Sequence, residues 1–431
     1  MKSIESGFLN AGPKEPGTGR RAGGLELEKK GTVLFVTYVN AWPDPPQRQA
    51  VLSLAKIYDR VVLFQGIEDI NANWVQAGNV VDYRWLDAKR TGNQATKLGR
   101  LLRFFSFRSQ LQKCFLEIRP EIVATYMLHG MAALPDTAMQ KKHGRLVSMI
   151  MDIPCLKDSG TIDYFVIRNG WRRLAQADVV WASDIYKANL TRQYGRLKTP
   201  PLVCHNCPTL DYLPEPTWPR DPWLRTELVQ QGAKLGAAGG CILLRAGAVG
   251  ECGGIEETLT VMQSLPEDFI FVMLGRPTAE YKIRLQNQIA KLGLKHRAFF
   301  WDRPSDEVWK KALQGADIGH LIHGPFPPGR IIRQYNLNSS LSNNRLFQYM
   351  AAGLPIISYD DQRMHDLYGE VPCFRVARLA RLGADIQAAW RELGGDAELR
   401  RKLGRAGRAA HREKYCWEKQ FAPVLNAILI Q

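Results

Sequence analysis

The sequence predicts an α/β protein with two Rossmann-like domains. Short apolar runs rich in β-branched residues alternate with stretches of helical spacing from Gly31 onwards, which is the pattern of a parallel sheet covered by helices. The alternation starts again at Cys241, after a proline-rich stretch, Tyr212–Pro222, that is typical of a domain linker. The predicted division is a disordered tail (1–30), a first domain (31–212), a linker (213–236), a second domain (237–412) and a C-terminal helix (413–431).

Composition and charge limit the classes of function. The chain has 431 residues, 45% of them hydrophobic and 23% charged, which is ordinary for a globular protein of two or three domains. The formal net charge of +16 favours anionic partners such as phosphorylated substrates, anionic lipid or nucleic acid. No apolar run approaches the roughly 18 residues that span a bilayer, and the first residues lack the apolar segment of a secretory signal. We therefore expect a cytoplasmic protein, with peripheral attachment to the inner face of the membrane as an open alternative.

The first domain begins with a predicted βαβ unit. A strand over Thr32–Val39 is followed by a loop, a helix over Gln47–Tyr58 and a second strand over Arg60–Gln65. The loop after the first strand lies at the carboxyl edge of the sheet, where such folds bind ligands. This loop, Asn40–Pro46, contains Trp42 and three prolines but no glycine, which predicts a stiff wall lined by an aromatic side chain.

Polar residues follow two later strands of the first domain. A strand predicted over Glu121–Met127 leads to His129, and a strand predicted over Arg145–Met151 leads to Asp152. An imidazole and a carboxylate that converge at one sheet edge are suited to acid–base catalysis. A hydrogen-bonded structural histidine is the alternative interpretation. We therefore name His129 and Asp152 as candidate catalytic residues.

A basic helix is predicted over Lys97–Lys113. It contains five Lys or Arg residues and no acidic residue, and its apolar positions follow helical spacing. Such a helix can lie on anionic lipid. The alternative is a surface helix that packs its apolar face on the sheet, which is the commoner situation for an amphipathic helix.

The second domain offers a glycine-rich turn after its first strand. The strand over Cys241–Ala246 is followed by the turn Gly247–Gly254 and a helix, so that flexible residues precede a helix amino end and their backbone N–H groups can hold phosphate. Gly247 and Gly250 are the candidate phosphate-binding residues of this turn. The turn matches neither the dinucleotide-binding pattern nor the P-loop pattern, so taken alone it is a weak signal. Arg330 and Arg333, in the long loop that follows residue 322, are further candidates for contact with an anion.

The stretch Leu341–Tyr359 predicts a helix start that suits an anion. Asn343 and Asn344 precede the helix, whose first turns carry Arg345 and Gln348 on one face, and a strand follows. The free N–H groups and the dipole at this end favour an anion, while a guanidinium and an amide suit phosphates and sugar hydroxyls. An ordinary amphipathic helix with a solvated arginine is the alternative.

The motifs together resemble the GT-B fold of glycosyltransferases. NNRLFQYMAAGLPIIS, from residue 343, is similar to the PNKLFEYMAAGLPVV segment of the family-4-like retaining enzymes. KALQGADIGHLI before it, ADVVWASDIYKANL and VCHNCP in the first half, and REKYCWEKQ near the end are further similarities. The resemblance covers most of residues 31–431. It implies two domains that face each other across a cleft, and a C-terminal helix that returns to the first domain.

The resemblance also implies roles for particular residues. The donor would be a UDP- or GDP-sugar bound by the second domain, with retention at the anomeric carbon and no metal or other cofactor. Arg345 would lie near the phosphates, Gln348 near the ribose and Arg303 near the base, and Asn344 is a further candidate for donor binding. His129 and Asp152 would face the sugar and the acceptor in the first domain.

Four positions depart from the family pattern. The usual two glutamates are replaced by Ser340 and Gln348, and the usual cations of the glycine-rich turn by Ala248 and Cys252. The loss of two phosphate-binding cations weakens the expected site, since charge-assisted contacts contribute roughly twice as much as neutral ones. Arg245, Arg330 or Arg333 are the candidates to replace them.

Two classes of function stay open from the sequence. The first is a glycosyltransferase of glycan or glycoconjugate biosynthesis that acts on a carbohydrate or lipid-linked acceptor, with the basic helix 97–113 as a contact to an anionic membrane surface. The alternative is a non-catalytic GT-B protein that serves as a binding or partner subunit of a glycosylation complex. A nucleic-acid partner is not expected, because the positive charge is accompanied by no nucleic-acid-binding motif.

Overall fold

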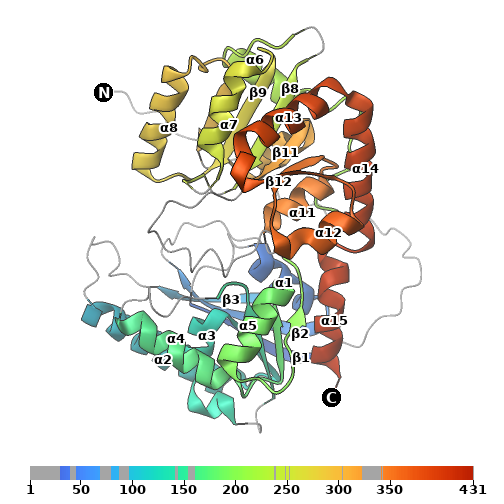
Figure 1. Ribbon diagram of the computed structural model, residues 1–431. Helices are drawn as coiled ribbons and strands as arrows, with labels where there is room; N and C mark the ends of the chain where they lie inside the picture. The colour runs from blue at the N-terminus through green and yellow to red at the C-terminus, as the bar shows by residue number, and fades with distance from the viewer. Residues whose placement is uncertain are drawn as a thin grey trace, which may run out of the picture.

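Two α/β domains, each organised around one parallel sheet, make up the computed structural model (Figure 1). The structure describes residues 30–38, 45–67, 79–86, 97–140, 144–153, 161–236, 239–247, 249–251, 253–302, 304–322, 341 and 343–430. The predicted tail 1–30 therefore lies outside the described residues except for its last residue, which begins the first strand.

The first domain contains a seven-stranded sheet in the order β3-β2-β1-β4-β5-β6-β7, with all neighbouring strands parallel. Its strands are β1 (Lys30–Thr37), β2 (Tyr58–Ile67), β3 (Val80–Leu86), β4 (Ile122–Tyr126), β5 (Arg145–Ile150), β6 (Val179–Ala182) and β7 (Leu202–Val203). Its helices are α1 (Pro45–Ala55), α2 (Lys97–Ile118), α3 (Met127–Ala133), α4 (Thr161–Leu174) and α5 (Ile185–Gly195). The strand order reverses between β1 and β4, which creates a crevice at their carboxyl ends.

The second domain contains a six-stranded parallel sheet in the order β10-β9-β8-β11-β12-β13. Its strands are β8 (Cys241–Ala246), β9 (Phe269–Gly275), β10 (Ala298–Asp302), β11 (Ile318–Leu321), β12 (Ile356–Tyr359) and β13 (Phe374–Ala377). Its helices are α6 (Trp223–Gln230), α7 (Ile255–Val261), α8 (Ala279–Lys291), α9 (Asp306–Gly315), α11 (Asn344–Ala351), α12 (His365–Glu370), α13 (Leu382–Gly395) and α14 (Ala397–Glu413). Here the order reverses between β8 and β11.

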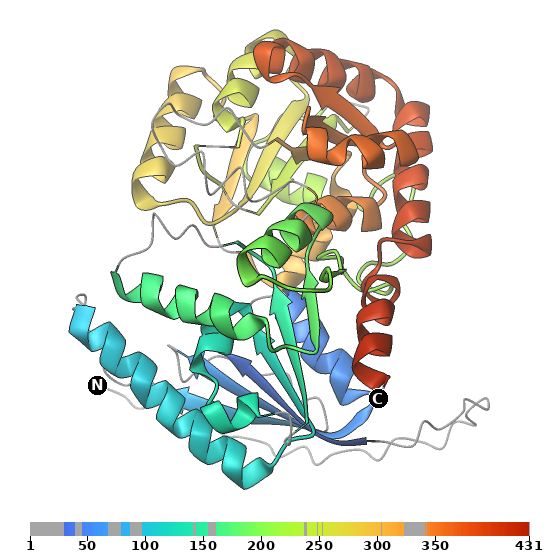
Figure 2. The same ribbon diagram turned by 60° about the horizontal axis from the view of Figure 1, so that its bottom comes forward.

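The last helix, α15 (Trp417–Leu429), returns to the first domain, as the GT-B resemblance implies. Its apolar residues join those of α1 in a core on one face of the first sheet, while α2, α3 and α4 cover the other face. Figure 2 shows α15 beside α1. The indole N–H of Trp417 donates to Ser53 Oγ at 2.8 Å, and Arg145 Nη1 donates to the Ala427 carbonyl at 2.8 Å. The domains are thus joined both by the linker and by this helix.

Several elements differ from the expectation. The strand that leads to His129 ends at Tyr126, so that His129 lies on α3 and not in a loop after the strand. Within the predicted linker 213–236, α6 places Leu224 and Leu228 in the core of the second domain. Strand β3 and helix α4 were not predicted. Within the described residues, no helix is long and apolar enough to span a bilayer.

Candidate functional site

The crevice of the second domain is formed by β8, β11 and α11. The helices after β8 and β11 depart on opposite sides of the sheet, which is the position where open α/β sheets bind ligands. After β8 comes the predicted glycine-rich turn. Helix α11 lies on the side of the second domain that faces the first domain (Figure 1). The site is therefore assembled from three segments that are distant in sequence.

Arg345, on the first turn of α11, is a buried cation with unused hydrogen-bonding groups. The side chain of Asn343 caps the helix by accepting from the Arg345 backbone N–H at 3.1 Å. Arg345 is only 4% exposed, and its Nε and Nη1 atoms have no partner in the described part of the chain. Burial lowers the pKa of Arg345. Such a charge is costly to bury unless an anion pairs with it, so the arrangement indicates an anion site.

Gly247 and Arg345 are brought together by the fold. Gly247 has a φ of +126°, and a Cβ atom placed on it would lie 2.5 Å from Arg345 Nη2. A side chain at this position would therefore displace the guanidinium. Gly250, by contrast, has no atom of the described residues within 4 Å of an added Cβ. The prediction placed both glycines near phosphate; the structure places Gly247 directly against the cation.

Tyr349 fixes α11 against the sheet. Its hydroxyl donates to the Leu244 carbonyl at 2.9 Å and accepts from the Ala246 N–H, also at 2.9 Å. Its ring packs against Gly319, where an added Cβ would lie 2.5 Å from the ring carbon Cδ2. The tyrosine thus anchors the helix to β8 and β11 and fixes the place of Arg345, one turn earlier on the same helix face.

Gln348 is held by two aromatic residues. Its Oε1 accepts from the Trp309 indole N–H at 3.2 Å, and its Nε2 donates to the Tyr212 hydroxyl at 3.2 Å. An amide has two donor hydrogens and an oxygen with two lone pairs, so these bonds leave capacity for a ligand. On the same helix, Asn344 Oδ1 is buried without a hydrogen-bond partner in the described residues. Arg303, the predicted base-contacting residue, lies outside the described residues, as do six other residues that the sequence analysis singled out (Trp42, Ala248, Cys252, Arg330, Arg333 and Ser340).

In the first domain, His129 and Asp152 lie at the carboxyl ends of the neighbouring strands β4 and β5. The His129 ring stacks on Tyr38, with centroids 6.1 Å apart and planes 12° apart. Asp152 is exposed and pairs with the buried ammonium of Lys187 at 2.8 Å. Its carboxylate is therefore already engaged, which sequence reasoning did not anticipate. Met127, at the end of β4, has a left-handed backbone (φ 57°), a strained conformation of the kind that clusters at functional sites.

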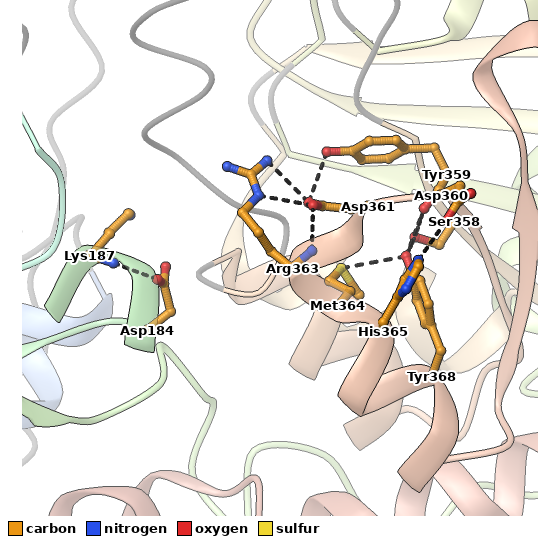
Figure 3. A network of polar contacts seen from close by, with 10 residues as sticks. All are labelled: Asp184, Lys187, Ser358, Tyr359, Asp360, Asp361, Arg363, Met364, His365 and Tyr368. Carbon is orange, nitrogen blue, oxygen red and sulfur yellow. Dashed lines mark hydrogen bonds and ion pairs between the residues drawn. The ribbon is translucent and has the colours of Figure 1, made fainter. Parts of the chain in front are cut away.

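A polar network closes the carboxyl end of β12 on the side that faces the first domain (Figure 3). Asp361 accepts from the Tyr359 hydroxyl at 2.9 Å and from Arg363 Nε at 2.9 Å. Burial raises the pKa of the Asp361 carboxyl, but the hydrogen bonds and charge of Arg363 outweigh it, and the pKa is lowered. Lys187 and Asp184 of the first domain lie opposite this network in Figure 3.

Sequence reasoning missed residues whose roles depend on distant partners. Trp309 and Tyr212 were not named as site residues, although their side chains bind both ends of the Gln348 amide. His320, in the middle of the apolar strand β11, was also missed. A polar residue inside an apolar strand is the signal that identifies such a position. In the described residues, no three His, Cys, Asp or Glu side chains are grouped as ligands of a metal ion.

Comparisons with known proteins give the architecture a context. Residues 310–426 match a family model described as "Glycosyl transferase-like". A search of curated proteins by sequence finds no significant match. Among solved structures, sucrose-phosphate synthase from Thermosynechococcus elongatus is similar with a TM-score of 0.65 and 13% identity, over 92% of this chain and 98% of that protein.

Two further structures carry nucleotides. HepE from Anabaena, solved in complex with UDP, has a TM-score of 0.62 and 16% identity over 92% of this chain and 100% of its own. The catalytic domain of starch synthase IV from Arabidopsis thaliana, bound to ADP and acarbose, has a TM-score of 0.63 and 10% identity over 93% of this chain and 98% of its own. The chain therefore has the GT-B fold, which confirms the predicted fold class.

Proposed function

We propose that the chain is a glycosyltransferase that moves a sugar from a nucleotide-diphosphate sugar to an acceptor bound by the first domain. The observation that carries this proposal is Arg345, a cation that is 4% exposed and lies against Gly247 at the crevice of the second domain. Two of its nitrogens have no partner among the described residues. The match of residues 310–426 to a glycosyltransferase-like family model agrees with it, since that segment includes α11.

The chemistry asks little of protein side chains beyond stabilising the leaving diphosphate and orienting the acceptor. Negative charge develops on the diphosphate as the bond to the sugar breaks, and a preorganised cation in a dry site stabilises that charge. Arg345 and the N–H groups of the turn would act in this way. Gln348 would hold the ribose through its remaining amide hydrogen and lone pair. We propose that no metal ion takes part, with retention at the anomeric carbon.

The first experiment asks which nucleotide base the donor carries. HepE was solved with UDP and starch synthase IV with ADP, so the fold accommodates more than one base. Isothermal titration with UDP, GDP, ADP and the corresponding sugar nucleotides measures which of them the chain binds. Absence of binding to all of them would overturn the proposal.

Arg345→Met tests the role of the cation. Charged hydrogen bonds contribute about 1.5–3 kcal/mol each, so we expect the affinity for the preferred nucleoside diphosphate to fall about 30-fold or more. Arg405→Met is the matched control, because Arg405 is exposed on α14. An Arg345→Met variant with unchanged affinity, and with Arg405→Met also unchanged, would contradict this assignment.

The alternative is a non-catalytic GT-B subunit of a glycosylation complex. It is favoured by Gln348, which replaces a carboxylate of the family pattern and is engaged by Trp309 and Tyr212. The two proposals differ in turnover. A catalyst hydrolyses or transfers the sugar of the bound donor, which coupled detection of the released nucleotide measures, whereas a binding subunit retains the donor intact when acceptors are supplied.

We further propose that the first domain contacts an anionic membrane surface through α2 and α4. Helix α2 buries one face in the domain core, as the packing alternative expected, yet Leu102 and Phe105 stay 60% and 54% exposed. Helix α4, which lies beside α2 (Figures 1 and 2), presents Phe165, 61% exposed, together with the exposed Arg168. Exposed apolar and basic side chains on two neighbouring helices suit contact with a lipid surface. A lipid-linked acceptor would be consistent with such a contact.

Flotation with vesicles tests this contact. We expect the protein to float with vesicles containing anionic phosphatidylglycerol but not with phosphatidylcholine alone, and high salt should weaken the binding. Leu102→Ser with Phe105→Ser should abolish it. Ile283→Ser, at a residue 59% exposed on α8 of the second domain, is the control. Equal flotation of the double variant and the control would exclude α2 as the contact.

A further inference from the structure

A buried polar relay lies beneath the glycine-rich turn. Its first member, Arg245, is the penultimate residue of β8 and is 2% exposed. Arg245 Nη1 donates to the Gly253 carbonyl at 3.0 Å and to the Ile322 carbonyl at 2.9 Å, and it lies 3.2 Å from His320 Nδ1. The other ring nitrogen, Nε2, lies 3.0 Å from Thr258 Oγ1.

The donors and acceptors of the relay have only one consistent direction. A guanidinium only donates, so His320 Nδ1 is the acceptor in this contact, and the two hydrogens of Arg245 Nη1 are shared among it and the two carbonyls. The imidazole then carries its hydrogen on Nε2. Nε2–H therefore donates to Thr258 Oγ1. The hydroxyl in turn donates to the Gly254 carbonyl at 2.6 Å. The chain of donation thus runs from Arg245 through His320 and Thr258 to the turn.

Both ends of the relay fasten the same turn. Arg245 holds the carbonyl of Gly253, and Thr258 holds that of Gly254, while the Ile322 contact adds the end of β11. A Cβ on Gly253 would lie 2.7 Å from Arg245 Nη2, so the turn rests directly on the guanidinium. With these carbonyls directed inward, the turn is fixed relative to the two strands that form the crevice.

The relay also places the positive charge of Arg245 near Arg345. Burial, and next the charge of Arg345, lower the pKa of Arg245 to about 9. The two cations are thus close enough to repel each other, and an anion held by Arg345 would relieve that repulsion. The family's usual cations are absent from the turn, at Ala248 and Cys252. Arg245 places a positive charge beneath the same turn without reaching the surface.

We propose that Arg245, His320 and Thr258 are positioning residues, which fix the glycine-rich turn for the diphosphate of the donor while Arg245 replaces a missing cation of that turn. All three side chains are buried, so we expect none of them to touch the ligand. The inference rests on the proposed function, because it concerns the same donor site.

Thr258→Val is the central variant, since it keeps the shape of the side chain and removes the hydroxyl. Thr258→Ser restores the hydroxyl. Thr260→Val is the matched control: the Thr260 hydroxyl makes the same bond to the carbonyl four residues earlier, at 2.8 Å, on the exposed side of α7. His320→Asn breaks the relay at a second point, because its shorter side chain keeps an acceptor near Arg245 and cannot reach Thr258.

The readout is the ratio of two affinities, for the best-bound of UDP, GDP and ADP and for the corresponding nucleoside, measured by NMR titration. Breaking the relay leaves buried groups unpaired only in the part of the site that would hold the phosphates. Thr258→Val and His320→Asn should therefore weaken the binding of the diphosphate about 10-fold and that of the nucleoside less than about twofold. Thr258→Ser and Thr260→Val should resemble the wild type. A merely structural role would lower thermal stability without changing this ratio.

The outcomes separate the two proposals. A wild-type protein that binds none of the three diphosphates overturns the proposed function, and this inference with it. Binding by the wild type, with an equal loss for diphosphate and nucleoside in Thr258→Val or with no loss at all, overturns the relay alone. A loss confined to the diphosphate, rescued by serine, supports it.

Discussion

At the scale of a single residue, the proposed anion site depends on Arg345. Its guanidinium is 4% exposed, and two of its nitrogens lack partners in the described residues. By contrast, Arg220, 5% exposed, uses its guanidinium on backbone carbonyls of Ala352, at 2.8 Å, and Gly353. The two arginines are similarly buried, but Arg220 keeps one nitrogen, Nε, without a partner in the described residues, whereas Arg345 keeps two and bonds to no backbone carbonyl there through them.

Arg345→Met should therefore stabilise the protein without ligand. Replacing an unpaired buried charge by an apolar side chain of similar length removes its desolvation cost, and we expect the free energy of unfolding to rise by about 1–3 kcal/mol. Arg220→Met should lower it, because the carbonyls of two residues then lose their donors. Urea unfolding of the two variants and the wild type measures this difference. A ligand-free Arg345→Met protein less stable than the wild type would show that Arg345 is structural.

At the scale of elements, local signals predicted what local chemistry decides. The start of α11 follows from Asn343 as N-cap, and its end from Gly353, which adopts a φ of +61°. Asp184 and Ser305 likewise cap α5 and α9 by accepting from the backbone N–H groups of Lys187 and Val308. Elements that depend on tertiary contacts were missed: α6 lies in a proline-rich stretch and is stabilised by burial of Leu224 and Leu228 in the second core.

The residues of the candidate site also fall into those that local sequence predicts and those that depend on tertiary contacts. Arg345 and Gly247 were predicted because a helix start and a glycine turn are readable in sequence, and the structure places them in contact. The partners of Gln348 were not, because Tyr212 lies 136 positions away along the chain. Arg245 was named only as a substitute cation. Its connection to His320 depends on the pairing of β8 with β11, which no local pattern encodes.

Gly247→Ala tests the turn as an element. A Cβ at this position would lie 2.5 Å from Arg345 Nη2, and alanine disfavours a φ of +126°. We expect a loss of stability of about 1–3 kcal/mol and a loss of nucleoside diphosphate binding similar to that of Arg345→Met. Gly250→Ala, which places its Cβ in open space, should retain wild-type stability, and differential scanning fluorimetry with and without ligand compares the two. Equal behaviour of both variants would contradict the contact with Arg345.

At the scale of the whole molecule, the chain passes between the domains twice, once after β7 and once before α15. These two neighbouring segments are called the crossing below. The backbone N–H of Trp417 donates to the Pro208 carbonyl at 2.9 Å, and this hydrogen bond joins the start of α15 to the segment after β7. The ring of His205 packs against Phe347 of α11 and Tyr415, with centroids 5.5 Å and 6.0 Å away, and Phe347 and Tyr415 also stack on each other at 5.4 Å. Helix α11, which carries Arg345, is therefore packed against the segment that connects the domains.

His411 makes this crossing sensitive to acid. It is fully buried on α14, where burial and then the charge of Arg408 lower its pKa to about 4, although the nearby Pro208 carbonyl acts in the opposite direction. In the unfolded chain the pKa returns to roughly 6.5. The folded state thus favours the neutral ring, and its contribution to stability is complete above pH 6.5 and is lost as the pH falls towards 4.

The expected size of this loss is up to about 3 kcal/mol, from a shift of roughly two and a half pKa units. His411→Leu cannot take up a proton, so its free energy of unfolding should vary less between pH 7 and pH 4 than that of the wild type. His365→Asn, which changes an exposed histidine of α12, should keep the wild-type dependence. Urea unfolding at several pH values measures the free energy of unfolding of the two variants and the wild type. If this free energy depends on pH equally in His411→Leu and the wild type, His411 is not the group that titrates.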